Sequence, residues 1–243
     1  MIQFFRRIRK KLLSENRFSK YFLYAIGEIV LVMIGILLAL EVNNWNEERK
    51  SIKHETKLLK ELLVDINFSI KEVDTVAYFN LKSQKYLEII EEHLDNDLPY
   101  AKVLDTAFGQ LDNWYMPYIP FSAYESLKES GIESITNDSI KQDITYLYEF
   151  GMKYLLEDNG QWEWSYNQNT TQRFMTKHIR RNKEHRDLAY PVNFMALKQD
   201  EEFRNFISVL IALRDSHIYA LKDMSRLMNG VVPQLKEELN TKR

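Results

Sequence analysis

The hydrophobic and polar positions divide this chain into one uninterrupted apolar stretch and a long polar remainder with helical periodicity. The stretch occupies residues 21–40 (YFLYAIGEIVLVMIGILLAL) and contains one ionisable side chain, Glu28. At about 1.5 Å per residue, a helix of this length is about 30 Å long, which matches the hydrocarbon thickness of a bilayer. The pattern predicts a transmembrane helix over residues 21–42, preceded by a tail over 1–20 and followed by an extramembrane domain over 43–243.

Helical periodicity continues beyond the apolar stretch. Apolar residues recur at every seventh position from Ile52 to Leu94, and Asn80 is the one polar residue in that series. Companion apolar residues three and four positions further on widen the stripe, which suits a helix bundle better than a two-stranded coiled coil. A helix over 45–94 is therefore predicted. No Pro or Gly separates it from the apolar stretch, so the two are expected to be continuous unless the sequence NNWN breaks them.

Capping residues mark the helices that follow. Further helices are expected near 101–111, over 122–130 with Gly131 closing the helix, from Asn137 or Asp138 to about 180, and over 200–228. Irregular structure or breaks are expected at 182–199, at the sequence DNG over 158–160, and at 230–233 before a polar tail. The chain is thus predicted to be all-α, with one N-terminal transmembrane helix followed by an antiparallel helical bundle of about four main helices.

The charges that flank the apolar stretch predict its orientation. Residues 1–20 contain seven Lys and Arg against one acidic residue, and three acidic residues soon follow the stretch. Because basic flanks stay in the cytoplasm, the N-terminus is predicted to be cytoplasmic and residues 43–243 extracytoplasmic. A cleaved signal peptide is disfavoured, since its apolar part is usually about 7–15 residues long. Tyr21, Tyr24 and Trp45 fit aromatic belts at the two membrane interfaces.

The extramembrane part is mildly acidic. The whole chain carries −2, the first twenty residues +6 and Glu28 −1, so residues 41–243 carry −7. Nucleic-acid binding needs a cationic footprint. The basic cluster KHIRRNKEHR at 177–186 is interpreted as a solvated helix end, where cations meet the negative end of the helix dipole. Nucleic acid is therefore not an expected partner. Membrane lipid is an expected partner because of the apolar stretch.

Residue types that carry catalysis or bind metals form no recognisable pattern. The chain has no Cys, and none of its five His follows an acidic residue in the Glu-x-x-His spacing of di-iron bundles. Gly-rich phosphate loops and the Gly-x-Ser-x-Gly motif are absent as well. We expect no catalytic residue, no cofactor and no metal site.

Glu28 is the most informative single residue. An acid inside a membrane costs at least about 2.5 kcal/mol on insertion scales, which makes it a functional candidate. Glu28, Val32, Gly35, Ala39 and Val42 share one helix face, and Gly35 with Ala39 allows close approach of another helix. Three interpretations stay open. The acid is protonated and hydrogen-bonds within a homo-oligomer, faces a multi-span partner along an ion route, or reaches the inner interface.

A second candidate is a group of aromatic residues. Trp114, Tyr115 and Tyr118 lie in the Pro-rich sequence NWYMPYIPF, and Trp162 with Trp164 lie in the later long helix. Aromatic rings stack on flat ligands and provide hot spots for protein partners, so these residues could line a ligand or partner groove. The alternative is that they fill the core or cap one end of the bundle.

Residues 11–50 contain the patterns S-E-N-x-F-S-K-Y, G-E-I, I-G-I-L-x-A-L and N-N-W-N-E, and residues 123–138 read AYESLKESGIESITND. In these motifs the chain resembles a family of uncharacterised single-span membrane proteins of Bacteroidetes-type bacteria. The resemblance implies a bacterial inner-membrane protein with a periplasmic helical domain, and it implies no activity, cofactor or catalytic residue. It draws attention to Gly27, Glu28, Gly35, Asn43, Asn44 and Trp45.

These observations favour a non-enzymatic, membrane-anchored helical scaffold or accessory subunit, which forms a homo-oligomer or binds a membrane-protein partner. The alternative is a sensor-like or ion-coupled component that signals sideways through Glu28. A periplasmic enzyme is a third hypothesis, and it would need a polar pocket with convergent carboxylates near the aromatic residues. The sequence leaves open whether a small-molecule ligand binds.

Overall fold

The computed structural model describes residues 18–242. Most of the basic tail predicted for 1–20 lies outside the described residues, as do the side chains of Tyr21 and Tyr24. The structure is 81% helical and 3% strand, which confirms the all-α prediction. It divides into two compact units, whose boundary in the sequence lies between His54 and Glu55. Helix α2 (Phe18–Asp95) contributes to both units and has no break at NNWN.

The first unit contains the apolar part of α2. By length and composition, α2 from Ala25 onward is apolar enough to cross a membrane, and none of its apolar window is buried within the chain. The predicted span ends at residue 42, two residues after the last residue of the apolar stretch, Leu40. The unit boundary at Glu55 is instead where α2 begins to contribute to the bundle, because Glu55 is 1% exposed.

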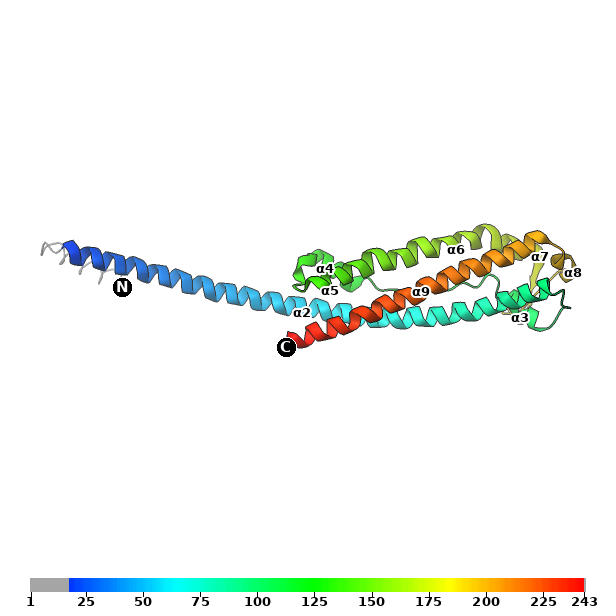
Figure 1. Ribbon diagram of the computed structural model, residues 1–243, viewed down its shortest axis with the longest axis horizontal. Helices are drawn as coiled ribbons and strands as arrows, with labels where there is room; N and C mark the ends of the chain where they lie inside the picture. Colours follow the sequence, from blue (N-terminus) through cyan, green and yellow to red (C-terminus); the bar gives the residue numbers. More distant parts are fainter. Residues whose placement is uncertain (1–17, 243) are drawn as a thin grey trace. The chain divides into compact units, whose positions relative to one another are not determined.

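The second unit is a bundle built on three long helical runs. These are Glu55–Asp95 of α2, the continuous run Asp138–His178, and α9 (Glu201–Thr241), and Figure 1 shows the run and α9 side by side. Side-chain contacts fix their directions. Lys242 lies 2.8 Å from Glu55, whereas Arg204 lies 3.0 Å from Asp95, so α9 is antiparallel to α2.

The run Asp138–His178, named here the composite helix, is also antiparallel to α9. Near its start Gln234 donates to Asp143, and further along Arg214 pairs with Glu163. It consists of α5 (Asp138–Tyr146), α6 (Gly160–Tyr166) and α7 (Gln172–His178), joined by π-helical segments η2 (Leu147–Met152), η3 (Tyr154–Asn159) and η4 (Asn167–Thr171). The DNG sequence, where a break was expected, lies in η3 and at the start of α6, so the helix widens there and continues.

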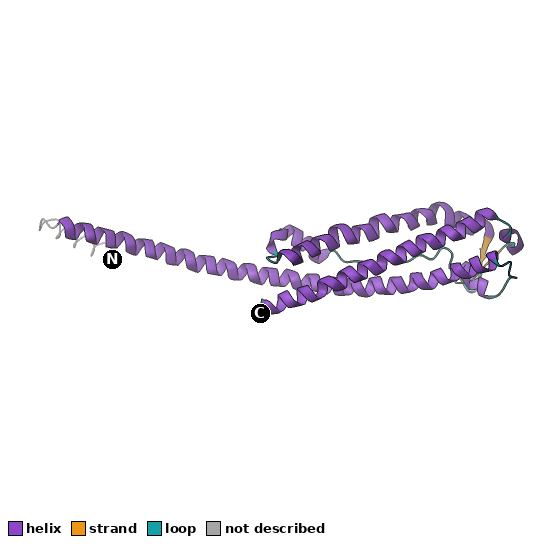
Figure 2. Ribbon diagram, viewed as in Figure 1, coloured by secondary structure: helices purple, strands orange, loops and turns teal. Residues whose placement is uncertain are grey.

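The remaining elements are short. They are α3 (Val103–Gly109), α4 (Ser122–Ser130), the 3₁₀ turn η1 (Ile132–Ser134), strands β1 (Ile179–Arg181) and β2 (Ala189–Pro191), and α8 (Phe194–Lys198). Between α3 and α4 an extended crossover segment, residues 112–121, returns along the bundle (Figure 2). As a result, α2 and the composite helix run in the same direction, and α9 runs against both.

Two predictions of irregular structure were wrong. Residues 182–199 contain β2 and α8, and β1 pairs antiparallel with β2. This hairpin depends on a tertiary contact, because a Cβ on Gly109 would lie 2.0 Å from the carbonyl oxygen of Asp187. The second error concerns 230–233, since α9 continues to Thr241 with Pro233 inside it.

The stripe of buried residues explains why α9 continues past Pro233. Val231 and Val232 are 5% and 8% exposed, and Leu235 is fully buried. Proline inside a helix costs about 3 kcal/mol, whereas burying a Val or Leu side chain contributes about 1.5–3 kcal/mol each. Packing against α2 and the composite helix therefore outweighs the lost backbone hydrogen bond.

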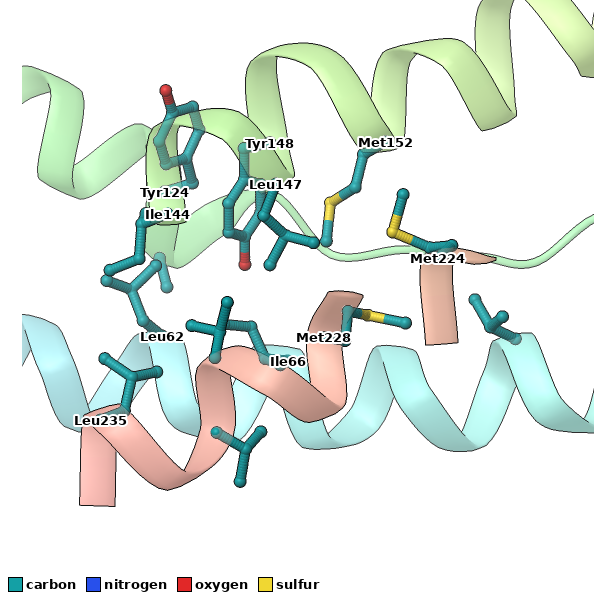
Figure 3. Close-up of a cluster of buried hydrophobic side chains, with 14 of the residues drawn as sticks. Leu62, Ile66, Tyr124, Ile144, Leu147, Tyr148, Met152, Met224, Met228 and Leu235 are labelled. Atoms are coloured by element: carbon teal, nitrogen blue, oxygen red, sulfur yellow. The ribbon is translucent and has the colours of Figure 1, made fainter. Parts of the chain in front are cut away.

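Two apolar cores fill the bundle. The first core packs α2 and α9 against α4, α5 and η2, and Figure 3 shows Leu62 of α2 near Leu235 of α9, with Ile66 near Met228. In this core the rings of Tyr124 and Tyr148 stack 4.4 Å apart. The second core packs α2 and the first part of α9 against α3 and α7. The two cores are separated along all three long helices by buried polar residues.

Candidate functional site

The buried polar residues between the two cores form one level of the bundle, named here the polar layer. Each long helix contributes to it, with Asn80, Ser83 and Gln84 from α2, Asn159 and Glu163 from the composite helix, and Arg214 and His217 from α9. Apolar core residues precede and follow this level on every helix. Because buried polar groups are costly unless they are hydrogen-bonded, the partners of each member decide what the layer does.

An ion pair lies at the centre of the layer. Arg214 is 1% exposed, and its Nε and Nη2 donate to Oε1 of Glu163 at 2.9 and 2.6 Å. Nη2 also donates to the carbonyl oxygen of Asn113 in the crossover segment at 2.7 Å. Burial raises the pKa of Glu163 above its usual value, while the adjacent Arg214 opposes that shift. Arg214 therefore connects α9 to both the composite helix and the crossover segment.

His217 makes the same kind of connection one turn later on α9. Its Nδ1 lies 2.6 Å from Oδ1 of Asn159, and its Nε2 lies 3.1 Å from the carbonyl oxygen of Tyr115. Burial lowers the pKa of His217 to about 4, and the positive charge of Arg214 acts in the same direction. The ring is therefore neutral at neutral pH. Its one proton can donate to the Tyr115 carbonyl or to Oδ1 of Asn159, both of which can only accept, while Nδ2 of Asn159 donates to Oγ of Ser216.

Asn80 of α2 binds the backbone of the same residue, Tyr115. Its Nδ2 donates to the Tyr115 carbonyl at 2.9 Å, and its Oδ1 accepts from the Tyr115 N–H at 3.4 Å. The side chain is fully buried. α2 and α9 thus both bind the backbone of Tyr115 in the crossover segment, through Asn80 from one helix and His217 from the other.

Three buried polar atoms at this level have no hydrogen-bond partner among residues 18–242. They are Oε2 of Glu163, Nη1 of Arg214 and Nε1 of Trp114. The last belongs to the crossover segment next to Asn113, to which Arg214 donates. Natural proteins satisfy such atoms with ordered water when the site has several polar partners. Apart from these three atoms, the hydrogen bonds of the layer connect four chain segments: α2, the composite helix, α9 and the crossover segment.

The structure separates the five aromatic residues that the sequence grouped together. Trp114 and Trp164 are neighbours with ring centroids 6.1 Å apart, whereas Tyr115 packs against Phe79 at 5.4 Å. Tyr118 is 85% exposed. Trp162 is 65% exposed and, two positions from Trp164, points to another side of the composite helix. One pair therefore borders the polar layer, and the others occupy separate places.

The candidate residues of the apolar stretch all lie on α2. A Cβ on Gly27 or on Gly35 would meet nothing within 4 Å, and Ala39 is exposed. Glu28 is partly covered. Asn43 and Asn44 are exposed, as is Trp45, whose ring lies 6.0 Å from the Arg49 guanidinium.

Sequence reasoning missed the polar layer, although a signal was present. Every third or fourth residue of α9 is buried, and Arg214 and His217 occupy two positions of that otherwise apolar stripe. Asn80 likewise interrupts the seven-residue series of α2. Polar residues at core positions are the signal, but the sequence does not tell which of them meet. Among residues 18–242 no group of three or more His, Asp or Glu is placed to hold a metal ion.

Comparison with known proteins places the chain in a sequence family. The family described as "Family of unknown function (DUF6090)" matches residues 28–215, which is more than half of the chain. The matched region contains Glu28, the crossover segment and the Glu163–Arg214 pair of the polar layer. Neither a curated protein nor a solved structure matches the chain.

Proposed function

This chain belongs to the DUF6090 family, a family of unknown function, and we propose that it is a single-span bacterial inner-membrane protein that works as a helical scaffold or accessory subunit. In this proposal it has no catalytic activity of its own, its N-terminus is cytoplasmic, and its bundle is periplasmic. One observation carries the proposal. The apolar window of α2 is long enough to cross a bilayer, and none of it is buried among residues 18–242.

The insertion energy supports the membrane part of the proposal. Residues 21–40 contain twelve Leu, Ile, Val and Phe residues, which contribute about −5 kcal/mol at roughly −0.4 kcal/mol each on insertion scales. One acid near the middle of a span costs about 2.5 kcal/mol. Insertion is therefore favourable even with Glu28 ionised.

The small residues of the apolar stretch support self-association. Gly35 and Ala39 are one turn apart, and the open space around Gly35 leaves room for another helix. Helices in lipid associate through such close contacts and through interhelical hydrogen bonds, which a protonated Glu28 would provide.

Single-cysteine crosslinking tests this proposal, because the natural chain has no Cys. With Ala39→Cys we expect disulfide-linked dimers in native membranes. Leu37→Cys is the matched control, since residues two apart lie on different sides of a helix. Fractionation should leave the full chain in the carbonate-resistant membrane pellet, and protease added to spheroplasts should digest the bundle. A chain that washes off with carbonate, or equal dimer yields at both positions, contradicts the proposal.

Glu28 favours a second candidate, an ion-coupled component that signals to a membrane partner. It is the one ionisable side chain within residues 21–40. Here Glu28→Gln should leave the Ala39→Cys dimer yield unchanged while failing to complement a deletion strain. If Glu28→Gln complements the deletion fully, ion coupling through this residue is excluded, and a hydrogen-bonding role in assembly is retained.

A further inference from the structure

A surface groove lies between the composite helix and α9, on the part of the bundle that contains the first core. Its exposed rim is aromatic, with Tyr146, Phe150 and Tyr154 on the composite helix and Tyr219 on α9, which are 55%, 64%, 51% and 72% exposed. Met224 and Leu227 of α9 also line it, and its volume is about 490 Å³. We name it the aromatic groove. Large aromatic residues gathered at one exposed groove are typical of interaction surfaces.

The π-helical segments explain why the three aromatic residues line one groove. They are four positions apart, which in an α-helix of 3.6 residues per turn would rotate each one further round the surface. η2 and η3 contain Phe150 and Tyr154, and each wider π turn takes in more residues, which offsets that rotation. The rings of Tyr146 and Phe150 stack 5.8 Å apart.

Gly151 also lines the groove, opposite the side chain of Met224. A Cβ at this position would lie 2.9 Å from the terminal methyl of Met224, so glycine allows η2 to approach α9 closely. The aromatic rim then stands above a closely packed floor. Such a shape fits an amphipathic helix, which inserts apolar side chains spaced three and four positions apart.

The charges around the groove determine which helix fits. Lys153 is paired with Glu149 at 2.5 Å, and Arg226, beside the groove, is paired with Asp223 at 2.5 Å. Two further carboxylates at the groove, Glu157 and Asp158, make no hydrogen bond or ion pair among residues 18–242, and both are exposed. Glu157 also acts on Lys153 through its charge, but the carboxylates that line the groove outnumber Lys153 and the neighbouring Arg226, so the groove has surplus negative charge for a cation.

We propose that the aromatic groove binds a cationic amphipathic helix of a partner protein. Lys or Arg side chains of that helix pair with Glu157 and Asp158 and lie against the faces of Tyr154 and Tyr219, where a cation is attracted to the aromatic ring. Its apolar side chains cover Phe150. A second copy of this chain fits less well, because a two-fold interface would bring the same acidic patch against itself. The inference rests on the proposed scaffold function and names the docking surface and the partner chemistry.

Photocrosslinking in native membranes tests this proposal on the full chain. A benzophenone amino acid replaces Phe150 in one variant and Phe68, a 51% exposed residue of α2, in the matched control. We expect the Phe150 variant to crosslink a partner peptide that is rich in Lys or Arg and has helical apolar spacing. Charge reversal by Glu157→Lys with Asp158→Lys should lower the yield about tenfold, since charged rim residues steer association. The conservative pair Glu157→Gln with Asp158→Asn should lower it less.

Several results would overturn the docking proposal. They are the absence of a crosslink above the Phe68 control, a crosslink to a second copy of this chain, a partner peptide without net positive charge, and a yield that charge reversal leaves unchanged. The Ala39→Cys dimers and the carbonate-resistant pellet are measured in the same membranes. If both persist while the Phe150 variant gives no crosslink, the docking proposal is contradicted and the proposed membrane scaffold function is not. If the chain leaves the membrane fraction, the proposed function itself fails.

Discussion

The first core and the polar layer are both buried in the same bundle, but they hold it together in different ways. Around Ile66 and Met228 the helices meet through side chains that require only volume and an apolar surface (Figure 3). Around Arg214 each buried group requires a particular partner, such as Glu163 or the Asn113 carbonyl. The core therefore stabilises any arrangement that excludes water, whereas the polar layer stabilises one register of the helices.

The crossover segment shows why that register matters. Two of its carbonyl groups, at Asn113 and Tyr115, receive donors from α9, and Tyr115 is also held by Asn80 of α2. A slip of α9 by one turn would leave these carbonyls and the Arg214 guanidinium buried without partners. Each such loss costs about 1–3 kcal/mol, and more for the charged group.

The largest expected effect follows from breaking the buried ion pair. Arg214→Met removes the partner of Glu163 and leaves a buried carboxylate alone. We expect the free energy of unfolding to fall by about 3–5 kcal/mol. Replacing both residues, with Arg214→Met and Glu163→Leu, should recover most of that loss because no uncompensated charge remains. Thermal unfolding of the full chain in detergent, followed by helical circular dichroism, measures both variants.

A core substitution is the matched comparison for that experiment. Leu62 is fully buried in the first core, and Leu62→Ala should cost about 2–5 kcal/mol through lost burial and the cavity left behind. The cost is of similar size, but it should add to that of Arg214→Met, since the two sites share no partner. If Arg214→Met with Glu163→Leu is as unstable as Arg214→Met alone, the pairing account of the polar layer is wrong.

Local signals made one part of the fold predictable from the sequence. The predicted helix over 122–130 has the bounds that the structure gives, and Gly131 closes it with φ of 87°. Asn137 caps the next helix by accepting from the backbone N–H of Ser139 and of Ile140. These features depend on residues within one turn of each other, so periodicity and capping rules are sufficient to find them.

Features that depend on distant partners were not predictable in this way. The β1–β2 hairpin needs the close approach at Gly109, and α9 passes through Pro233 because other helices bury its neighbours. The polar layer was predictable only in part. Polar residues at core positions could be read from the stripes of α2 and α9, but the meeting of His217 with Tyr115 requires the path of the crossover segment. No short-range rule gives that path.

The second prediction distinguishes the polar layer from the first core by how the unfolding free energy depends on pH. The pKa of His217 is lowered from 6.5 to about 4 by burial, so the unfolded chain binds a proton more readily than the folded one. Its contribution to stability is complete above about pH 6.5 and is lost as the pH falls towards 4. Between about pH 7 and pH 5 the loss should be about 2 kcal/mol. Glu163, whose pKa is raised, acts in the opposite direction, because the fold favours its neutral form as the pH falls.

A comparison of variants isolates the histidine from that opposing group. His217→Gln keeps a donor for the Tyr115 carbonyl but removes the titration. The difference in unfolding free energy between the natural chain and this variant should therefore shrink by about 2 kcal/mol from about pH 7 to pH 5. Leu62→Ala should show a constant difference over the same range. A pH-independent difference for His217→Gln would show that the ring is not held neutral by burial.

The smallest expected effect concerns Asn80, which belongs to the polar layer but occupies a position of the seven-residue series of α2 that is apolar everywhere else. Asn80→Leu restores the apolar repeat and gains burial of about 1.5–3 kcal/mol, but it leaves the Tyr115 N–H without a partner at a cost of about 1–3 kcal/mol. The Tyr115 carbonyl keeps its contact with His217. Because the two terms nearly cancel, the unfolding free energy should change by no more than about 1 kcal/mol.

The local consequence of Asn80→Leu should be larger, since the crossover segment loses its attachment to α2. Hydrogen exchange of the Tyr115 amide should therefore accelerate strongly while amides of the first core keep their rates. Unchanged exchange at Tyr115 would mean that the clamp from α2 contributes nothing to the register of the bundle.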